Sequence, residues 1–220
     1  AQRLHREGPL PATACVDLLL PAIAALAEAH DVGVIHRDLK PGNLFLAVDR
    51  RGRPEVRVLD FGIAKAVDER DREHHTHVGV VIGTALYLAP ELVRGAQNAS
   101  PASDQYALGV ILYECVTGVM PFDGDSLYDL MHAIMSAPVT PPRSHNAAVP
   151  EGFERAILRA MERDPARRFG SVRDLGRELL AWAGPETRVV WERVFGSPSL
   201  APPAPSAAPP PNTTLERSSN

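Results

Sequence analysis

The residues with the clearest chemical potential lie in two short motifs of this 220-residue chain. They are HRDLKPGN and, beginning 17 residues after its final asparagine, DFG. Asp38, Asn43 and Asp60 supply hard oxygen donors, which suit Mg²⁺ carrying a phosphate ester better than zinc. Lys40 adds a positive charge two residues from Asp38, suited to a phosphoryl group in transfer. Since Asp38 can also accept a proton from an attacking hydroxyl, or orient it, the motifs predict phosphoryl-transfer chemistry.

The elements that must position these side chains begin with a helix. Residues 14–30 place apolar side chains three and four apart, which predicts an amphipathic helix, and Pro21 inside it predicts a kink or register break. Three short apolar runs follow at 32–36, 43–48 and 56–61, and we expect small strands there. The segment between the last two runs is polar and rich in turn residues, so these two are expected to form a hairpin.

The second half of the chain is predicted to be helical. Residues 66–81 are polar without a clear period, which favours a long loop. Residues 104–117 are apolar nearly all round and predict a buried helix, with Ser103 or Asp104 as its N-cap and Gly118 as its stop. Amphipathic helices are expected to follow at 126–136, 151–163 and 171–183.

Composition limits the class of protein. Hydrophobic residues make up 45% of the chain, which excludes a wholly disordered protein, and a net charge of −4 argues against nucleic-acid or membrane-surface binding. The two cysteines are 100 residues apart, so a disulfide framework or zinc site is not expected and a reducing cytoplasm fits. We expect one domain over 1–196 and a disordered Pro/Ala/Ser-rich linker or tail over 197–220.

The HRD-x-x-x-x-N and DFG motifs, together with Ala89-Pro90-Glu91, resemble the large C-terminal lobe of a eukaryotic-type (Hanks-type) bacterial serine/threonine protein kinase. The resemblance covers about residues 4–183, and Lys40 favours the Ser/Thr branch. It implies an α+β, mainly α-helical fold with a few short strands around the catalytic loop. It also implies transfer of the ATP γ-phosphate to Ser or Thr of a protein substrate. Ala85 departs from the proline common at that position in bacterial members.

The resemblance assigns roles to single residues. Asp38 would be the catalytic base, Lys40 would neutralise the phosphate of ATP, and Asn43 and Asp60 would bind Mg²⁺. Arg37 would be a partly buried charge that receives an anion supplied by phosphorylation of the activation segment.

Further positions match the regulatory and structural parts of that family. Thr84 resembles the substrate-loop threonine that contacts the catalytic aspartate, which leaves Thr76 as the candidate phosphosite. Glu91 resembles the acid that pairs with the arginine of a D-P-x-x-R motif, here Arg168. Asp104 resembles the acid that holds the catalytic-loop backbone, although a plain N-cap role explains it equally well.

Other polar or reactive residues have simpler explanations. His36 lies in an apolar context and is expected to be a packed core residue. Cys115 is expected to be a small core residue of the buried helix. The histidines at 74, 75 and 77 are expected to be solvated rather than metal ligands.

The motifs of the small N-terminal kinase lobe are missing from the sequence. No G-x-G-x-x-G precedes the catalytic loop and no lysine precedes Lys40. We therefore expect a kinase as the parent protein, little activity from this chain alone, and an uncovered apolar patch where the small lobe should pack. The parent could be anchored by a membrane helix beyond the tail, and a dimer of it is left open. Two alternatives are an inactive kinase-like lobe that acts as a binding or scaffold module and a small-molecule phosphotransferase of the same fold.

Overall fold

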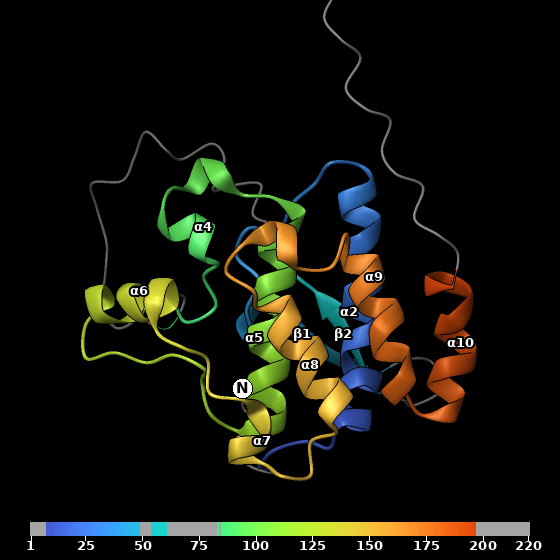
Figure 1. Cartoon of the computed structure of the whole chain (residues 1–220). Coiled ribbons are helices and arrows are strands. Elements are labelled where there is room, and N and C mark those ends of the chain that lie inside the picture. The colour runs from blue at the N-terminus through green and yellow to red at the C-terminus, as the bar shows by residue number, and fades with distance from the viewer. Residues whose placement is uncertain (1–7, 49–53, 61–82, 84, 197–220) are drawn as a thin grey trace, which may run out of the picture.

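Two long helices, α2 (Ala12–Asp31) and α5 (Pro101–Thr117), lie at the centre of the structure (Figure 1). This computed structural model describes residues 8–48, 54–60, 83 and 85–196. The other helices of four or more residues are α4 (Pro90–Val93), α6 (Leu127–Ser136), α7 (Pro142–His145), α8 (Glu151–Ala160), α9 (Val172–Leu179) and α10 (Pro185–Phe195). Short 3₁₀ turns are η1 (Pro41–Asn43), η4 (Ala96–Asn98), η5 (Pro165–Arg167) and η6 (Leu180–Trp182).

Helix α5 is buried along nearly its whole length, as its apolar sequence predicts. Its N-cap prediction was wrong, because the helix begins three residues earlier than expected. Ser100 is the N-cap, Pro101 occupies the first helical position, and the Ser100 amide donates to Ser103 Oγ at 3.2 Å. Gly118 ends the helix in the left-handed conformation, at φ 76°, as expected for a C-cap glycine.

Helix α2 runs through Pro21 as a single element and ends in a Schellman turn. The Gly33 amide donates to His30 O at 3.0 Å and the Val34 amide to Ala29 O at 2.8 Å, with Gly33 at φ 79°. This turn occupies part of the segment 32–36, so the strand predicted there was wrong. Among the described helices, α2 alone is long and apolar enough to span a membrane, a test that core helices also pass, and it is half-buried in this fold.

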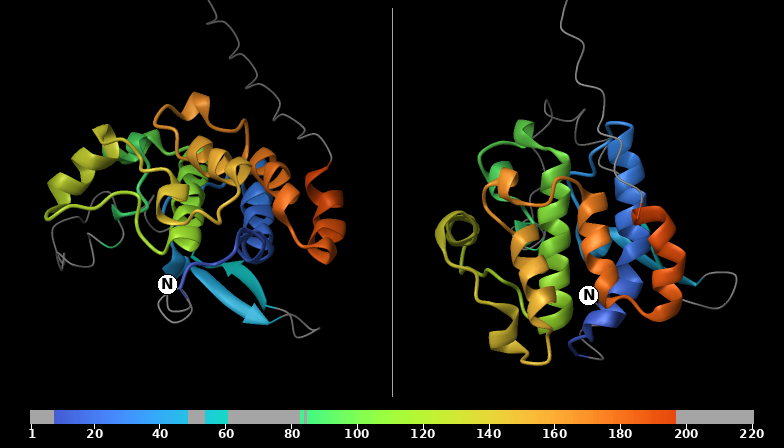
Figure 2. Two further views of the ribbon diagram at one scale, coloured as in Figure 1. Left: turned by 60° about the horizontal axis from the view of Figure 1, so that its bottom comes forward. Right: turned by 45° about the vertical axis from the view of Figure 1, so that its right-hand side comes forward.

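The hairpin predicted on either side of the turn-rich segment is present. Strands β1 (Leu44–Val48) and β2 (Pro54–Val58) pair antiparallel, with Leu44 opposite Val58 and Leu46 opposite Val56. They lie on one side of the helical body, where β2 packs against α2 (Figure 2). The hairpin exposes large apolar side chains, including Phe45 at 57% and Val48 at 67% exposure.

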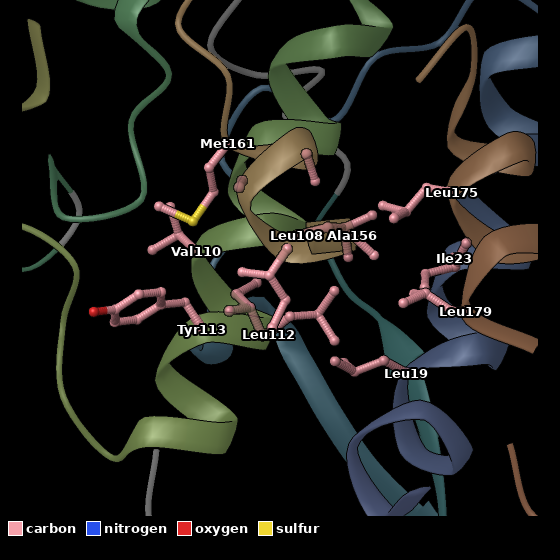
Figure 3. Packing of buried hydrophobic residues seen from close by; sticks show 14 of the residues in the cluster. Leu19, Ile23, Leu108, Val110, Leu112, Tyr113, Ala156, Met161, Leu175 and Leu179 are labelled. Carbon is pink, nitrogen blue, oxygen red and sulfur yellow. The ribbon is translucent and has the colours of Figure 1, made fainter. Parts of the chain in front are cut away.

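The hydrophobic core lies where α2, α5, α8 and α9 meet (Figure 3). Side chains from all four helices and from the residue after α8 fill it, among them Ile23, Leu108, Leu112, Ala156, Met161, Leu175 and Leu179. Gly109 lets α5 approach α8 closely, because a Cβ there would lie 2.7 Å from Met161 Cγ. The mainly helical fold with two short strands therefore agrees with the class predicted from sequence.

The C-terminal end of the described region departs from the predicted boundaries. Helix α8 ends at Ala160 rather than 163, and α9 gives way to a 3₁₀ turn after Leu179. Helix α10 was not predicted. Its Val189 and Val190 are exposed while Phe195 is fully buried against Gly176, so the segment lacks a clear apolar stripe.

Candidate active site

One buried carboxylate fixes the backbone of the predicted catalytic loop, residues 36–43. Asp104, with 1% exposure, accepts the backbone amides of His36 at 2.8 Å and Arg37 at 3.0 Å. His30 Nε2 lies 2.8 Å from the same carboxylate. Ser100 is the N-cap of α5, so Asp104 does not have that role. Asp104 instead holds the backbone of the predicted catalytic loop. His30 was missed by the sequence analysis, because nothing in its position at the end of a predicted helix indicates a partner 74 residues away.

His36 connects the catalytic loop to the end of β2. Its side chain is fully buried, as predicted, and its Nε2 lies 3.0 Å from Leu59 O. The Asp38 amide donates to His36 Nδ1 at 3.3 Å. A ring whose Nδ1 accepts and whose Nε2 faces a carbonyl carries its proton on Nε2. His36 thus fixes the spacing between Asp38 and the segment that leads to Asp60.

Asp38, Lys40 and Asn43 form a compact polar group. Lys40 Nζ lies 3.1 Å from Asp38 Oδ2, and Asn43 Nδ2 donates to Asp38 O at 2.7 Å. The side chains of Asp38 and Lys40 are 17% and 25% exposed, so both are partly shielded yet reachable from solvent. Because the Asn43 amide nitrogen is occupied, its Oδ1 is the atom that can face a cation.

Asp60 follows a residue whose backbone is hydrogen-bonded to this group. The amide of the preceding residue, Leu59, donates to Asn43 O at 2.8 Å. Asp60 is exposed and adopts φ 50°, a left-handed conformation that is uncommon outside glycine and often marks functional positions. The structure thus places Asp60 one residue after a backbone hydrogen bond to Asn43, and Asn43 in contact with Asp38.

Arg37 was expected to be partly buried, and this prediction was wrong. Its backbone is left-handed, at φ 66°, and its side chain is exposed rather than partly buried. The segment expected to cover it belongs to residues 61–82, which lie outside the described part of the chain. Thr76 and Thr84 also lie outside the described residues.

A hydrogen bond that sequence analysis missed ties the segment after Thr84 to α5. Tyr87 donates its hydroxyl to Glu114 Oε2 at 2.7 Å. Burial and this hydrogen bond raise the pKa of Tyr87, so it remains a donor at neutral pH. Tyr87 and Asp38 both line a shallow hollow beside the predicted catalytic loop.

Glu91 and Arg168 form a buried two-bond fork across 77 residues of sequence. The Arg168 guanidinium donates to both carboxylate oxygens at 2.7 and 2.8 Å, and Ser103 Oγ donates at 2.9 Å. Burial alone would raise the pKa of Glu91, but these hydrogen bonds outweigh it and hold the pKa below its ordinary value. The pair anchors the start of α4 to the segment before α9.

Comparison with known proteins agrees with this fold. The sequence matches the protein kinase domain family over residues 1–179. It is 42% identical over 184 residues to the serine/threonine-protein kinase pkn3 of Myxococcus xanthus, covering 82% of this chain and 33% of the relative. It is 38% identical over 190 residues to PknL of Mycobacterium tuberculosis, covering 84% of this chain and 46% of that protein.

Solved structures share the fold at low sequence identity. The crystal structure of the Rad53 kinase domain and SCD2 in complex with AMPPNP has a TM-score of 0.62 at 21% identity. That match covers 82% of this chain and 63% of the other. These matches show that the helical body with its short hairpin has a protein kinase fold. The chain belongs to the protein kinase domain family. It spans less than half the length of pkn3 and of PknL.

Proposed function

We propose that these residues form the catalytic and substrate-binding lobe of a serine/threonine protein kinase. Such an enzyme transfers the γ-phosphate of ATP to Ser or Thr hydroxyls of protein substrates. The observation that carries the proposal is the group of Asp38, Lys40 and Asn43, held in place by the buried Asp104. The relatives named serine/threonine-protein kinases support the acceptor class, and the AMPPNP bound by the Rad53 kinase domain supports an adenine nucleotide as donor.

Asp38 and Lys40 divide the chemistry between them. The Asp38 carboxylate orients the substrate hydroxyl and accepts its proton as the oxygen attacks the phosphoryl group. Lys40, 3.1 Å from Asp38, offsets the negative charge on the transferring phosphoryl oxygens. Because both groups are fixed in the folded lobe, little reorganisation is needed at the moment of transfer.

The donor set near Asp38 fits Mg²⁺. Asn43 bonds to Asp38 O through its amide nitrogen, so its Oδ1 does not take part in that bond. Asp60 is exposed. Amide and carboxylate oxygens are ligands that Mg²⁺ accepts when it also binds phosphate. We therefore assign Asn43 and Asp60 as the residues that would hold Mg²⁺. When bound, the metal with its ATP neutralises charge on the β- and γ-phosphates.

A small lobe supplied from outside these 220 residues completes the proposed enzyme. The sequence has no G-x-G-x-x-G ahead of the catalytic loop and no lysine before Lys40, so it lacks the usual clamp on the phosphates. The exposed Phe45 and Val48 of the hairpin offer an apolar surface for such a lobe. Regulation would act on Thr76, whose phosphate would be received by the exposed Arg37.

The decisive test uses a chimera in which the small lobe of PknL precedes residue 1. We expect it to phosphorylate Ser/Thr peptides with ATP and Mg²⁺, and Asp38→Asn to lower kcat by at least about a hundredfold. Asp125→Asn changes an exposed acid outside the site and is the matched control. A chimera that binds ATP without any transfer would favour the scaffold alternative. Transfer only to small-molecule alcohols would favour a small-molecule phosphotransferase.

The same assay on the isolated 220-residue chain tests the need for the small lobe. We expect little or no transfer, because phosphoryl transfer depends on positioning that these residues cannot supply alone. A rate close to that of the chimera would contradict the proposal that a small lobe is required.

A further inference from the structure

The two cysteines of the chain meet at the interface of its two central helices. Cys15 lies in the first turn of α2, and Cys115 lies near the end of α5. Leu10 bonds to both: its amide donates to Cys115 O at 2.8 Å, and its carbonyl accepts from Cys15 Sγ at 3.8 Å. The Cys115 side chain raises the pKa of the Cys15 thiol, so the two side chains are neighbours. Both are free thiols in the structure, although they are 100 residues apart in sequence.

Helices α2 and α5 run antiparallel and lie side by side (Figures 1 and 2). A polar contact joins them at one end. At that end His30 Nε2 of α2 lies 2.8 Å from Asp104 Oδ2 of α5. At the other end lie Cys15 of α2 and Cys115 of α5, which are both free thiols and form no covalent bond. A bond between the two sulfurs would close this second end. It would therefore fix the pair of helices on which the catalytic loop rests.

We propose that Cys15 and Cys115 form an intrachain disulfide when the protein meets a hydroperoxide, and that this bond clamps α2 to α5. The two thiols differ in access, which sets the order of events: Cys115 is partly exposed, whereas Cys15 is fully buried. The neighbouring Cys115 and burial both raise the pKa of the Cys15 thiol, so Cys15 is not the residue that reacts first.

The chemistry proceeds in two balanced steps. The Cys115 sulfur attacks one oxygen of the hydroperoxide, the O–O bond breaks, and Cys115 becomes a sulfenic acid while an alcohol or water leaves. The Cys15 sulfur then attacks the Cys115 sulfur, the S–O bond breaks, and the Cys15 proton leaves with the hydroxyl as water. Two thiols are oxidised to one disulfide and one peroxide is reduced. A dithiol reductant reverses the reaction by exchange.

The test is peptide mapping of the full 220-residue chain after treatment with hydrogen peroxide. Trypsin places Cys15 in the peptide 7–37 and Cys115 in 95–143, because no lysine or arginine lies within either. We expect the two peptides to be linked in monomeric protein, with a loss of about 2 Da that dithiothreitol reverses. Linked peptides found only in dimers, or Cys115 oxidised to sulfinic acid without any link, would overturn the proposal.

The clamp is measured separately by thermal unfolding. Closing a loop of about 100 residues should raise Tm by roughly 5–10 °C in the oxidised protein, with the rise removed by reductant. Cys115→Ser, which changes the partly exposed partner, should show no peroxide-dependent rise. Complete linkage without any rise in Tm would overturn the clamp. Neither measurement depends on kinase activity, so the result is independent of the proposed function.

Discussion

Replacement of Arg168 by alanine should cost more stability than almost any other single change in the described lobe. The Arg168 side chain has 0% exposure and donates through both terminal nitrogens to Glu91. It also donates to the carbonyls of Ala102 and Glu162, each at 2.7 Å. The substitution therefore removes a cation and leaves a buried carboxylate and three carbonyls, the third that of Arg163, without this partner.

The magnitude follows from what remains after the change. Removing one partner of a buried ion pair costs about 3–5 kcal/mol, because the other charge stays in a poorly solvated site. Ser103 Oγ still donates to Glu91 at 2.9 Å, which offsets part of that cost. We therefore expect a loss of about 3–4 kcal/mol in the free energy of unfolding at pH 7.

Urea unfolding followed by far-UV circular dichroism measures this loss in the 220-residue chain. The matched control is Arg155→Ala, which removes an exposed i,i+4 ion pair to Glu151 whose partners are 69% and 67% exposed. That control should cost about 0.5 kcal/mol or less. If Arg168→Ala lost no more than Arg155→Ala, the argument that burial makes this pair essential would be refuted.

Three further predictions concern other buried groups. The folded pKa of Glu91 lies below its ordinary value of 4.5. The ionised Glu91 therefore stabilises the fold at neutral pH, and this stabilisation is lost as the pH falls below 4.5. Glu91→Gln should flatten the dependence of the free energy of unfolding on pH between 6 and 3, measured in steps of about one pH unit. An unaltered slope would contradict this. Asp104→Asn loses one anionic acceptor and should speed hydrogen exchange of the His36 or Arg37 amide by about tenfold or more, as read by NMR; equal rates would count against its loop-holding role. Gly109→Ala should lower stability by about 1–2 kcal/mol in thermal unfolding, because the added methyl meets Met161 and overpacking outweighs the gain in helix propensity; a more stable variant would disprove this.

Local sequence patterns predicted the helices and the hairpin because those elements depend on nearby residues. The apolar run of α5 and the turn-rich segment between β1 and β2 show this. The strand predicted at 32–36 failed because its apolar residues follow a helix whose end is set by Gly33, and the left-handed turn there outweighs strand propensity. Helix α10 was missed because it buries little more than one large side chain.

In the candidate site, motifs identified single residues, but most long-range contacts between side chains could not be predicted. The motif residues Asp38, Asn43 and Asp60 could be named from spacing and family resemblance, and the Glu91–Arg168 pair from the D-P-x-x-R motif. The contacts of His30 with Asp104 and of Tyr87 with Glu114 could not, because they join residues 74 and 27 positions apart with no motif to connect them. Such contacts are set by how whole helices pack.

The long sequence separation within the Glu91–Arg168 fork has a consequence for synthesis on the ribosome. Glu91 leaves the exit tunnel 77 residues ahead of its partner. At translation rates of about 5–20 residues per second, the nascent chain carries this carboxylate in contact with water for roughly 4–15 s. During that interval α4 has no anchor, so the lobe can complete its interior only after the segment bearing Arg168 emerges.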